Sequence, residues 1–255
     1  MTQSKEIKVS TTDPESGYLF REGKPEGFHY LNHQTVDFKY NIITDVYVTP
    51  GNVHDSQPYL ARLARQKERF GFAVEAVALD SGYLSTPICH ALQEQQIFAV
   101  IGHRRFHPVR GLFPKWKFVY EAEVDQYLCP QGQNLSYRTT TREGYREYHS
   151  NPEHCKTCPR LNECTQSKNH KKVITRHVWE DSREQVRQNR LSISGKMLYK
   201  KRKETIERSF ADAKQLHGLR YCRFRGISAV SEQVLLTAAC QNMKKIATHL
   251  AAKAL

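Results

Sequence analysis

The chain has 255 residues, of which 39% are hydrophobic and 25% charged, a composition typical of globular proteins and not of disordered tails. No stretch approaches the ~18 consecutive apolar residues of a membrane-spanning helix, and the first residues do not form a signal peptide. A cytoplasmic protein without membrane contact is expected. The seven cysteines cannot all pair, which argues against a disulfide framework.

The formal net charge is +13, and its excess is concentrated in one segment. Residues 196–225 contain ten basic side chains and three acidic ones. Clustering on this scale favours a nucleic-acid partner, because cations that neutralise phosphates release bound counterions. The alternative is an ordinary solvated helix face.

The first 26 residues are polar and rich in turn formers, and strands are expected only after them. Phe28–Phe38 and Tyr40–Thr49 are rich in β-branched and aromatic residues, which predicts an antiparallel pair. Pro50 and Gly51 end the second strand. Asp55 or Ser56 is then expected to cap a helix that runs to about Arg69.

Val74–Leu79 is short and almost wholly apolar, which predicts a strand buried on both faces in a parallel arrangement. A helix is expected at 86–95, and a second buried strand at 97–101. The order strand, strand, helix, strand, helix, strand predicts a mixed α/β sheet with helices as crossovers.

Residues 104–180 are aromatic, basic and cysteine-bearing, without a sustained helical or strand period, and are interpreted as an insertion. It divides a core that consists of residues 1–103 and a helical part at 181–255. A long helix is expected after Arg183, ending near Gly218. A final helix at about 228–252 is expected to turn one apolar side inward, formed by Val230, Val234, Leu235, Ala238, Met243 and Ile246.

Two acidic residues stand out by their positions. Asp80 follows the buried strand, and the carboxyl ends of such strands are where open α/β sheets bind ligands. Glu207 lies in the basic segment, with Lys200, Lys203 and Lys214 expected near its face. Carboxylates bind hard cations such as Mg²⁺, and paired ions support phosphoryl transfer. The alternatives are a turn former at Asp80 and a salt-bridged helix around Glu207.

Four cysteines of the insertion form a candidate structural zinc site: Cys129, Cys155, Cys158 and Cys164. Four thiolates satisfy tetrahedral Zn²⁺, and Cys-x-x-Cys is a usual ligand spacing. His149, His154 and His170 are substitutes, and four unliganded thiols are the alternative. Cys89, Cys222 and Cys240 are expected in buried positions.

Three separated motifs resemble those of the DDE transposases of bacterial insertion sequences. They are residues 40–56, the run Ala78-Leu79-Asp80-Ser81-Gly82-Tyr83, and residues 199–226. The resemblance implies an RNase H-like fold, with a zinc-ribbon-like insertion found in one group of that family. It also implies that Asp80 is the second catalytic aspartate and Glu207 the catalytic glutamate, both holding Mg²⁺ or Mn²⁺.

The family signature around the glutamate falls on Tyr199, Arg202, Glu207 and Lys214. The interval from Arg202 to Glu207 is one residue longer than in the shortest version of the signature. The basic segment is expected to contact DNA through Tyr199, Lys200, Arg202, Lys203, Arg208, Lys214 and Arg220.

The first aspartate of the family's three-acid site has no match. Upstream of Phe28 no apolar strand ends in aspartate, because Asp13 precedes a proline in a turn, and Asp37 lies between two strands. We therefore expect the carboxyl-terminal part of a transposase, inactive alone, whose first strand is missing or encoded upstream.

Three functions are consistent with these patterns. The first is a transposase fragment that binds double-stranded transposon ends and target DNA in the bacterial nucleoid, as a homo-oligomer by family resemblance, with an upstream-encoded fragment as a further partner. The second is a non-catalytic DNA-binding or zinc-binding remnant. The third is an unrelated metal-dependent nuclease of RNase H-like fold.

Overall fold

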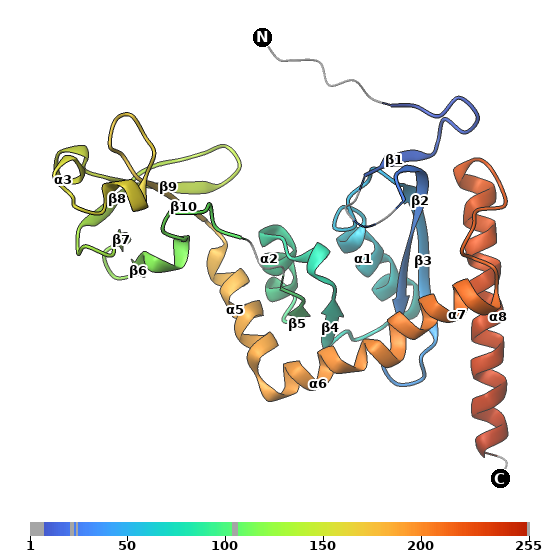
Figure 1. The fold of residues 1–255 in the computed structure, drawn as a ribbon. Coiled ribbons are helices and arrows are strands. Elements are labelled where there is room, and N and C mark those ends of the chain that lie inside the picture. Colours follow the sequence, from blue (N-terminus) through green and yellow to red (C-terminus); the bar gives the residue numbers. More distant parts are fainter. Residues whose placement is uncertain (1–7, 21–22, 24, 104–106, 254–255) are drawn as a thin grey trace. The chain divides into compact units, whose positions relative to one another are not determined.

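The structure is a computed structural model that describes residues 8–20, 23, 25–103 and 107–253. The chain divides into two compact units. The first consists of Met1–Gly102 and Val186–Leu255, and the second of His103–Gln185, which covers the segment expected to be an insertion. Figure 1 shows the elements of both units along the chain.

The first unit begins with an antiparallel sheet of order β1-β2-β3, formed by Gly17–Leu19, Gly27–Val36 and Ile43–Pro50. The expected antiparallel pair is therefore confirmed as β2 and β3. The short strand β1 was not predicted, because three residues give no readable alternation. It pairs with only the first three residues of β2, on the edge opposite β3.

A second sheet of this unit holds the parallel strands β4 (Ala76–Leu79) and β5 (Phe98–Ile101). The helix α2 (Thr86–Glu94) connects them, as predicted. The expected single mixed sheet is a wrong prediction for the described residues, since no strand among them joins β2 to β4. For the same reason β4 is not buried on both faces: Ala76 is exposed and the other three residues are half-buried.

The core of the first unit lies around α2 and β5. Cys89, Leu92, Ala99 and Ile101 are all at most 1% exposed there. The helix α1 (Tyr59–Phe70) packs on this core through Leu63. Its N-terminal cap is Pro58 and not Asp55 or Ser56, because residues 55–58 form turns before the helix begins.

The expected long helix after Arg183 is broken into several elements. They are α5 (Glu180–Leu191), α6 (Ile193–Lys201), the π-helical turn η3 (Lys203–Glu207) and α7 (Arg208–Leu216). Ser192 separates α5 from α6, and its side chain accepts a hydrogen bond from the N–H of Gly195 as an N-cap. Gly218, with φ +66°, follows the end of α7 in the left-handed conformation expected there.

The last helix, α8 (Ile227–Lys253), is confirmed, but its inward side is only partly as predicted. Val230, Val234 and Ala238 are buried, whereas Leu235, Met243 and Ile246 are about half exposed or more. A helix of 27 residues is about 40 Å long, and its carboxyl-terminal half runs past the β2–β3 sheet in Figure 1. Its carboxyl-terminal half contacts the unit mainly through polar residues, such as Gln241 with Ser209 and Lys245 with the carbonyl of Asn41.

The second unit is a five-stranded antiparallel sheet of order β10-β9-β8-β7-β6. Its strands are Val119–Glu121, Gln126–Leu128, Asn134–Thr140, Tyr145–Ser150 and Val173–His177, β6 to β10 in chain order. The short helices η2 (Lys115–Lys117), α3 (Pro152–Lys156) and α4 (Leu161–Cys164) complete the unit. Its core is aromatic, centred on Tyr148, which is fully buried against Tyr127 and Leu135. The strands were not predicted because most of their other residues are polar or exposed, which hides the alternation.

Candidate functional site

Asp80 lies immediately after β4, at the carboxyl end of the strand, as the sequence indicates. Its carboxylate accepts the N–H of Ser81 at 2.6 Å and caps the short 3₁₀ turn η1 (Ser81–Tyr83). The residue is exposed. This carboxylate is therefore oriented by the backbone at a strand end and remains open to solvent, which suits an external cation or donor.

A glycine connects the Asp80 turn to the basic segment. Gly102 follows β5, and a Cβ at this position would lie 2.9 Å from the N of Ser81 and 2.6 Å from the hydroxyl of Tyr199. Such distances are too short for any side chain, so only glycine allows this approach. Ser81, which follows Asp80, and the Tyr199 side chain on α6 therefore both lie against Gly102.

The basic segment changes helical type at the predicted glutamate. The N–H of Glu207 donates to the carbonyl of Arg202, five residues earlier, at 3.1 Å. This is the hydrogen bond of a π turn, which accommodates one extra residue within a helix and often occurs at functional sites. The longer interval from Arg202 to Glu207 is absorbed in this turn, so both residues stay on one side of the segment.

Arg202 is the centre of the polar contacts. Its Nη1 donates to the Tyr199 hydroxyl at 3.3 Å and lies 3.7 Å from Oε1 of Glu207. The side chain of Arg202 is 14% exposed, whereas that of Glu207 is 51% exposed. The arginine is held in the protein and the carboxylate reaches solvent, an arrangement that keeps Glu207 oriented yet accessible.

Tyr83 lies within electrostatic reach of Asp55, Asp80 and Arg202. Burial raises the pKa of Tyr83 to about 12, the negative charges of Asp55 and Asp80 contribute to the rise, and Arg202 opposes it. Oδ2 of Asp55 lies 3.5 Å from the Cβ position of Gly82, in the Asp80 turn. The sequence pointed to Asp55 only as a turn or cap residue, and nothing local to it signals this approach.

The other acids near the strands have structural contacts. Asp13 accepts the Tyr30 hydroxyl at 2.9 Å and the N–H of Gly226 at 3.3 Å. Asp37 accepts three backbone N–H groups in the turn between β2 and β3. Asp45 pairs with Arg62. Each of these three carboxylates therefore has hydrogen-bond partners within the protein.

Most of the expected DNA-contacting residues are solvent-exposed. Lys200, Lys203, Arg208, Lys214 and Arg220 are exposed, while Tyr199 and Arg202 are half-buried. A neighbouring lysine is neutralised by an acid of the segment, because Lys201 forms an ion pair with Glu204 at 2.7 Å. The exposed cations follow the segment on both sides of Glu207 and leave it positively charged.

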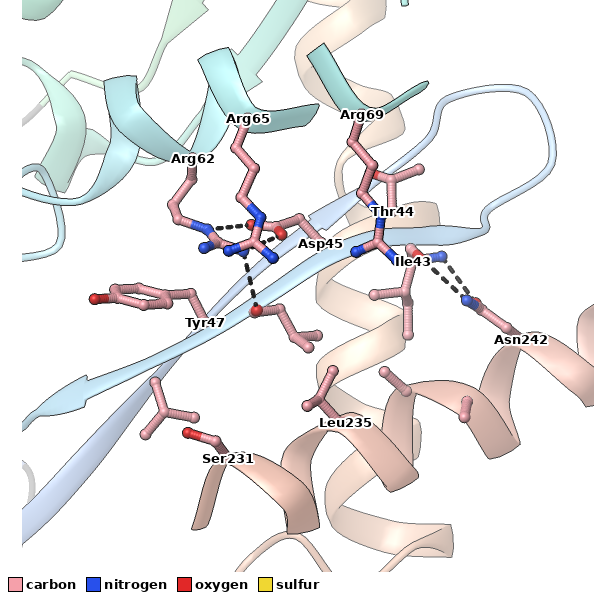
Figure 2. A pocket seen from close by; sticks show the side chains of 14 residues that line it. Ile43, Thr44, Asp45, Tyr47, Arg62, Arg65, Arg69, Ser231, Leu235 and Asn242 are labelled. Atoms are coloured by element: carbon pink, nitrogen blue, oxygen red, sulfur yellow. Dashed lines mark hydrogen bonds and ion pairs between the residues drawn. The ribbon is translucent and has the colours of Figure 1, made fainter. Parts of the chain in front are cut away.

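A second group of cations lies on α1, over the open face of β3. Figure 2 shows Arg62, Arg65 and Arg69 reaching toward a hollow of ≈ 410 Å³ beside α8. Arg62 donates to Asp45 at 2.8 Å and stacks on Tyr47, with 4.6 Å from its guanidinium carbon to the ring centroid. Asn242 of α8 bonds both the N–H and the carbonyl of Ile43, at 2.8 and 2.9 Å. The hollow therefore lies where α1, β3 and α8 pack together.

The four cysteines of the candidate zinc site lie in the second unit. Burial raises the pKa of the Cys164 thiol, Lys172 opposes this, and Cys155, Cys129 and Cys158 add to the rise, so all three lie within electrostatic reach of Cys164. Cys129 Sγ accepts the N–H groups of Gln131 and Gln133 at 3.4 and 3.3 Å. Across the described ranges, however, no three His, Cys, Asp or Glu side chains are arranged to hold a metal ion.

The remaining cysteines differ from expectation in two cases. Cys89 is fully buried, as predicted, but Cys222 and Cys240 are exposed. Cys240 lies on the unpacked side of α8, and Cys222 lies in the irregular segment before it. The prediction for Cys240 was wrong because much of this side of α8 is uncovered, and that for Cys222 was wrong because the residue lies in the segment between α7 and α8.

Comparison with known families gives one match. Residues 128–247, just under half of the chain, match the family model described as "Transposase DDE domain". The matched region includes the four cysteines of the candidate zinc site, Tyr199, Arg202 and Glu207, but not Asp80. Searches of curated proteins and of solved structures gave no match. Within the described part of the chain, none of the helices has the length and apolar character needed to cross a membrane.

Proposed function

Since residues 128–247 match the transposase DDE domain family, we propose that this chain acts on double-stranded DNA as part of an insertion-sequence transposase. The observation that carries the proposal is the contact of Arg202 with Glu207 across the π turn, beside the Asp80 turn. It orients an accessible carboxylate within an exposed basic segment. Phosphate binding and cation binding therefore coincide there.

Asp80 and Glu207 are the residues that would hold Mg²⁺ or Mn²⁺. Both are exposed carboxylates, and hard divalent cations prefer such oxygen ligands. When bound, the ions supply activation of a water or 3′-hydroxyl and stabilise the leaving oxygen. Arg202 holds Glu207 in place, and the exposed lysines and arginines bind the DNA backbone. Two acids do not complete a three-acid site, so the chain by itself binds DNA without cutting it.

The proposal is tested by the salt dependence of binding to a fluorescent DNA duplex. Replacing Lys203 and Arg208 by alanine should lower the slope of log K against log salt by about 1.8, since each lost phosphate contact contributes about 0.9. The matched control removes the same charge elsewhere, with Arg65→Ala and Arg69→Ala on α1. Equal slopes for the two double variants would show that only net charge matters and would contradict the proposed interface.

The alternative of a non-catalytic DNA-binding remnant differs in one measurable respect. In a transposase part, Asp80→Asn and Glu207→Gln should abolish the binding of Mn²⁺, detected by its paramagnetic relaxation of water protons, while DNA affinity is retained. A remnant without a metal site would show the same weak Mn²⁺ signal in the wild type and both variants. Mg²⁺-dependent cleavage of DNA by the chain alone would contradict our proposal of inactivity.

We also propose that Cys129, Cys155, Cys158 and Cys164 bind a structural Zn²⁺ ion. The donor chemistry fits, and N–H groups already point at Cys129 Sγ, as they would at a thiolate ligand. Four protein ligands leave no open position, so the role is stability of the second unit. Metal analysis should give one zinc per chain, lost in Cys158→Ser but kept in the exposed control Cys240→Ser. Zinc content below about one tenth per chain in wild type purified with added zinc would refute the site.

A further inference from the structure

The outer edge of β3 lies in the hollow beside the three arginines of α1. β3 is the last strand of the β1-β2-β3 sheet, so in the described part of the chain only its side toward β2 has a neighbouring strand. Six consecutive residues of it, Ile43–Val48, line the hollow of ≈ 410 Å³. Side chains of a strand alternate between two faces, so consecutive lining residues mean that the hollow follows the backbone edge of β3. We name this hollow the edge groove.

Two residues of this edge turn their backbone groups into the groove. The N–H of Gly51 donates to the carbonyl of His29 on β2 at 2.7 Å, so every second residue back along β3 also faces β2 with its backbone groups. Val46 and Val48 lie between those positions and face the edge groove instead. Within the described ranges, the one contact to their N–H and C=O groups is a long one of 3.4 Å, from Arg62 Nη2 to the carbonyl of Val46. Such groups on an edge strand readily accept another strand.

The two ends of the edge groove limit the length of an occupant. At one end Asn242 of α8 bonds both the N–H and the carbonyl of Ile43, as a neighbouring peptide group would. At the other end Pro50 closes β3 and has no N–H to offer. The stretch between them therefore has room for an extended segment of about five residues, at ~3.4 Å per residue.

Two helices form the walls of the groove and differ in character. α1 runs antiparallel to β3, since Arg62 bonds to Asp45 and Gln66, one turn later, accepts the hydroxyl of Thr44 at 2.8 Å. Figure 2 shows the arginines of α1 in a row along this wall. The wall from α8 is mostly small and apolar, formed by Ser231, Leu235, Ala238 and Ala239. An occupant therefore meets cations on one face and apolar side chains on the other.

Arg65 and Arg69 provide the charge that an occupant has to complement. Arg62 is paired with Asp45, whereas Arg65 and Arg69 are exposed and form no ion pair with any residue that the structure describes. They are four residues apart on α1, about 6 Å along the helix axis. Alternate side chains of an extended segment are about 6.6–6.8 Å apart. Two carboxylates at positions i and i+2 of such a segment would therefore each meet one arginine in a charge-assisted hydrogen bond.

We propose that the edge groove binds an extended acidic segment of a separate polypeptide by strand addition to β3. Its acidic residues face Arg65 and Arg69, its alternate apolar residues face α8, and its backbone pairs with Val46 and Val48. The backbone groups and the apolar wall favour a polypeptide over DNA, whose outer surface consists of phosphates. None of the residues that we assign to DNA or metal binding lines this groove, so the inference does not depend on the proposed transposase function.

The test uses the full chain and a fluorescent synthetic peptide in which two glutamates alternate with three valines. Amide hydrogen exchange, measured by NMR, should slow by about tenfold or more at Val46 and Val48 when the peptide is bound. The amides of Asp45 and Tyr47 should not change, because they already face β2. A peptide with lysine in place of glutamate should bind at least about tenfold more weakly. A peptide with proline at its central position cannot pair and should give no protection.

Matched variants place the peptide in the edge groove. Arg65→Ala combined with Arg69→Ala changes only exposed side chains of α1 and should weaken peptide binding at least about tenfold. The control, Arg138→Ala combined with Arg142→Ala, removes the same charge from exposed positions of the second unit and should leave the affinity unchanged. Equal losses in the two double variants, or no protection at Val46 and Val48, would overturn the proposal.

Two further outcomes would assign the groove to another occupant and also overturn the proposal. The first is protection of Val46 and Val48 that appears without peptide and rises with protein concentration, since a second copy would then cover the edge. The second is displacement of the peptide by a DNA duplex, since Arg65 and Arg69 would then bind phosphates. The peptide measurements contain no DNA or metal, so a failure there leaves the proposed transposase function untouched.

Discussion

Arg202 and Glu207 are joined twice, by a backbone hydrogen bond of 3.1 Å across a π turn and by a side-chain approach of 3.7 Å. The first contact results from one extra residue in the segment, and the second preserves the side-chain pair despite it. The π turn therefore accommodates the extra residue while the side chains of Arg202 and Glu207 stay close together.

Removing the extra residue tests this account. Deletion of Glu204, which is exposed, should convert η3 into a regular α-helical turn and leave both flanking helices in register. The thermal unfolding midpoint, measured by circular dichroism, should change by no more than about 3 °C. The control deletes Ala211 inside α7 and rotates the remainder of that helix by about 100°, which moves Ala213 out of the core. A similar loss of stability in both deletions would contradict the assignment of the π turn.

Gly102→Ala should disturb the meeting of the Asp80 turn with α6. The new Cβ would lie 2.6 Å from the Tyr199 hydroxyl and 2.9 Å from the N of Ser81, so we expect a loss of about 1–3 kcal/mol in the free energy of unfolding. Tyr199→Phe in the same chain should restore part of it. Gly82→Ala is the control, because its nearest neighbour, Asp55 Oδ2, lies at an ordinary 3.5 Å. Urea unfolding that ranks Gly82→Ala as the more harmful change would refute this account.

Tyr83 should make stability fall at alkaline pH. Its pKa of about 12 in the folded protein lies above the ordinary value of 10.0. Above pH 10 the unfolded chain releases this proton first, so the contribution of Tyr83 to stability is complete below pH 10 and is lost as the pH rises to about 12. The contribution of Tyr83 to the free energy of unfolding is at most about 2–3 kcal/mol. Tyr83→Phe should flatten the decline over this window in urea titrations, and an unchanged decline would argue against the buried position of the phenol.

Asp45→Asn should destabilise the joint between α1 and β3. The Arg62 and Asp45 side chains are 16% and 12% exposed, so the variant leaves a nearly buried guanidinium without its carboxylate. We expect a loss of about 3–5 kcal/mol in the free energy of unfolding, as for a broken buried ion pair. Glu163→Gln breaks the solvent-exposed pair with Arg160 and should leave the unfolding midpoint unchanged. If both variants behave alike, the burial of the Arg62–Asp45 pair has no energetic consequence.

The sequence by itself determined the local elements and the identity of the candidate site residues. The paired strands, α2, β5 and α8 follow from side-chain periodicity, and Asp80 at a strand end follows from one apolar run. Tyr199, Arg202 and Glu207 lie within nine residues, so their proximity needs no long-range contact. These features depend on residues close together in the chain, so they can be predicted from the sequence alone.

Only the tertiary structure decided how those elements come together. Periodicity states which face of a strand is apolar but not which strand lies beside it, so the separation of β2 from β4 could not be predicted from the chain. The approach of Asp55 to Gly82 and the exposure of Cys222 and Cys240 likewise depend on packing between distant segments. Burial is a property of the assembled neighbours. One open edge in the sheet is enough to leave an apolar strand such as β4 half exposed.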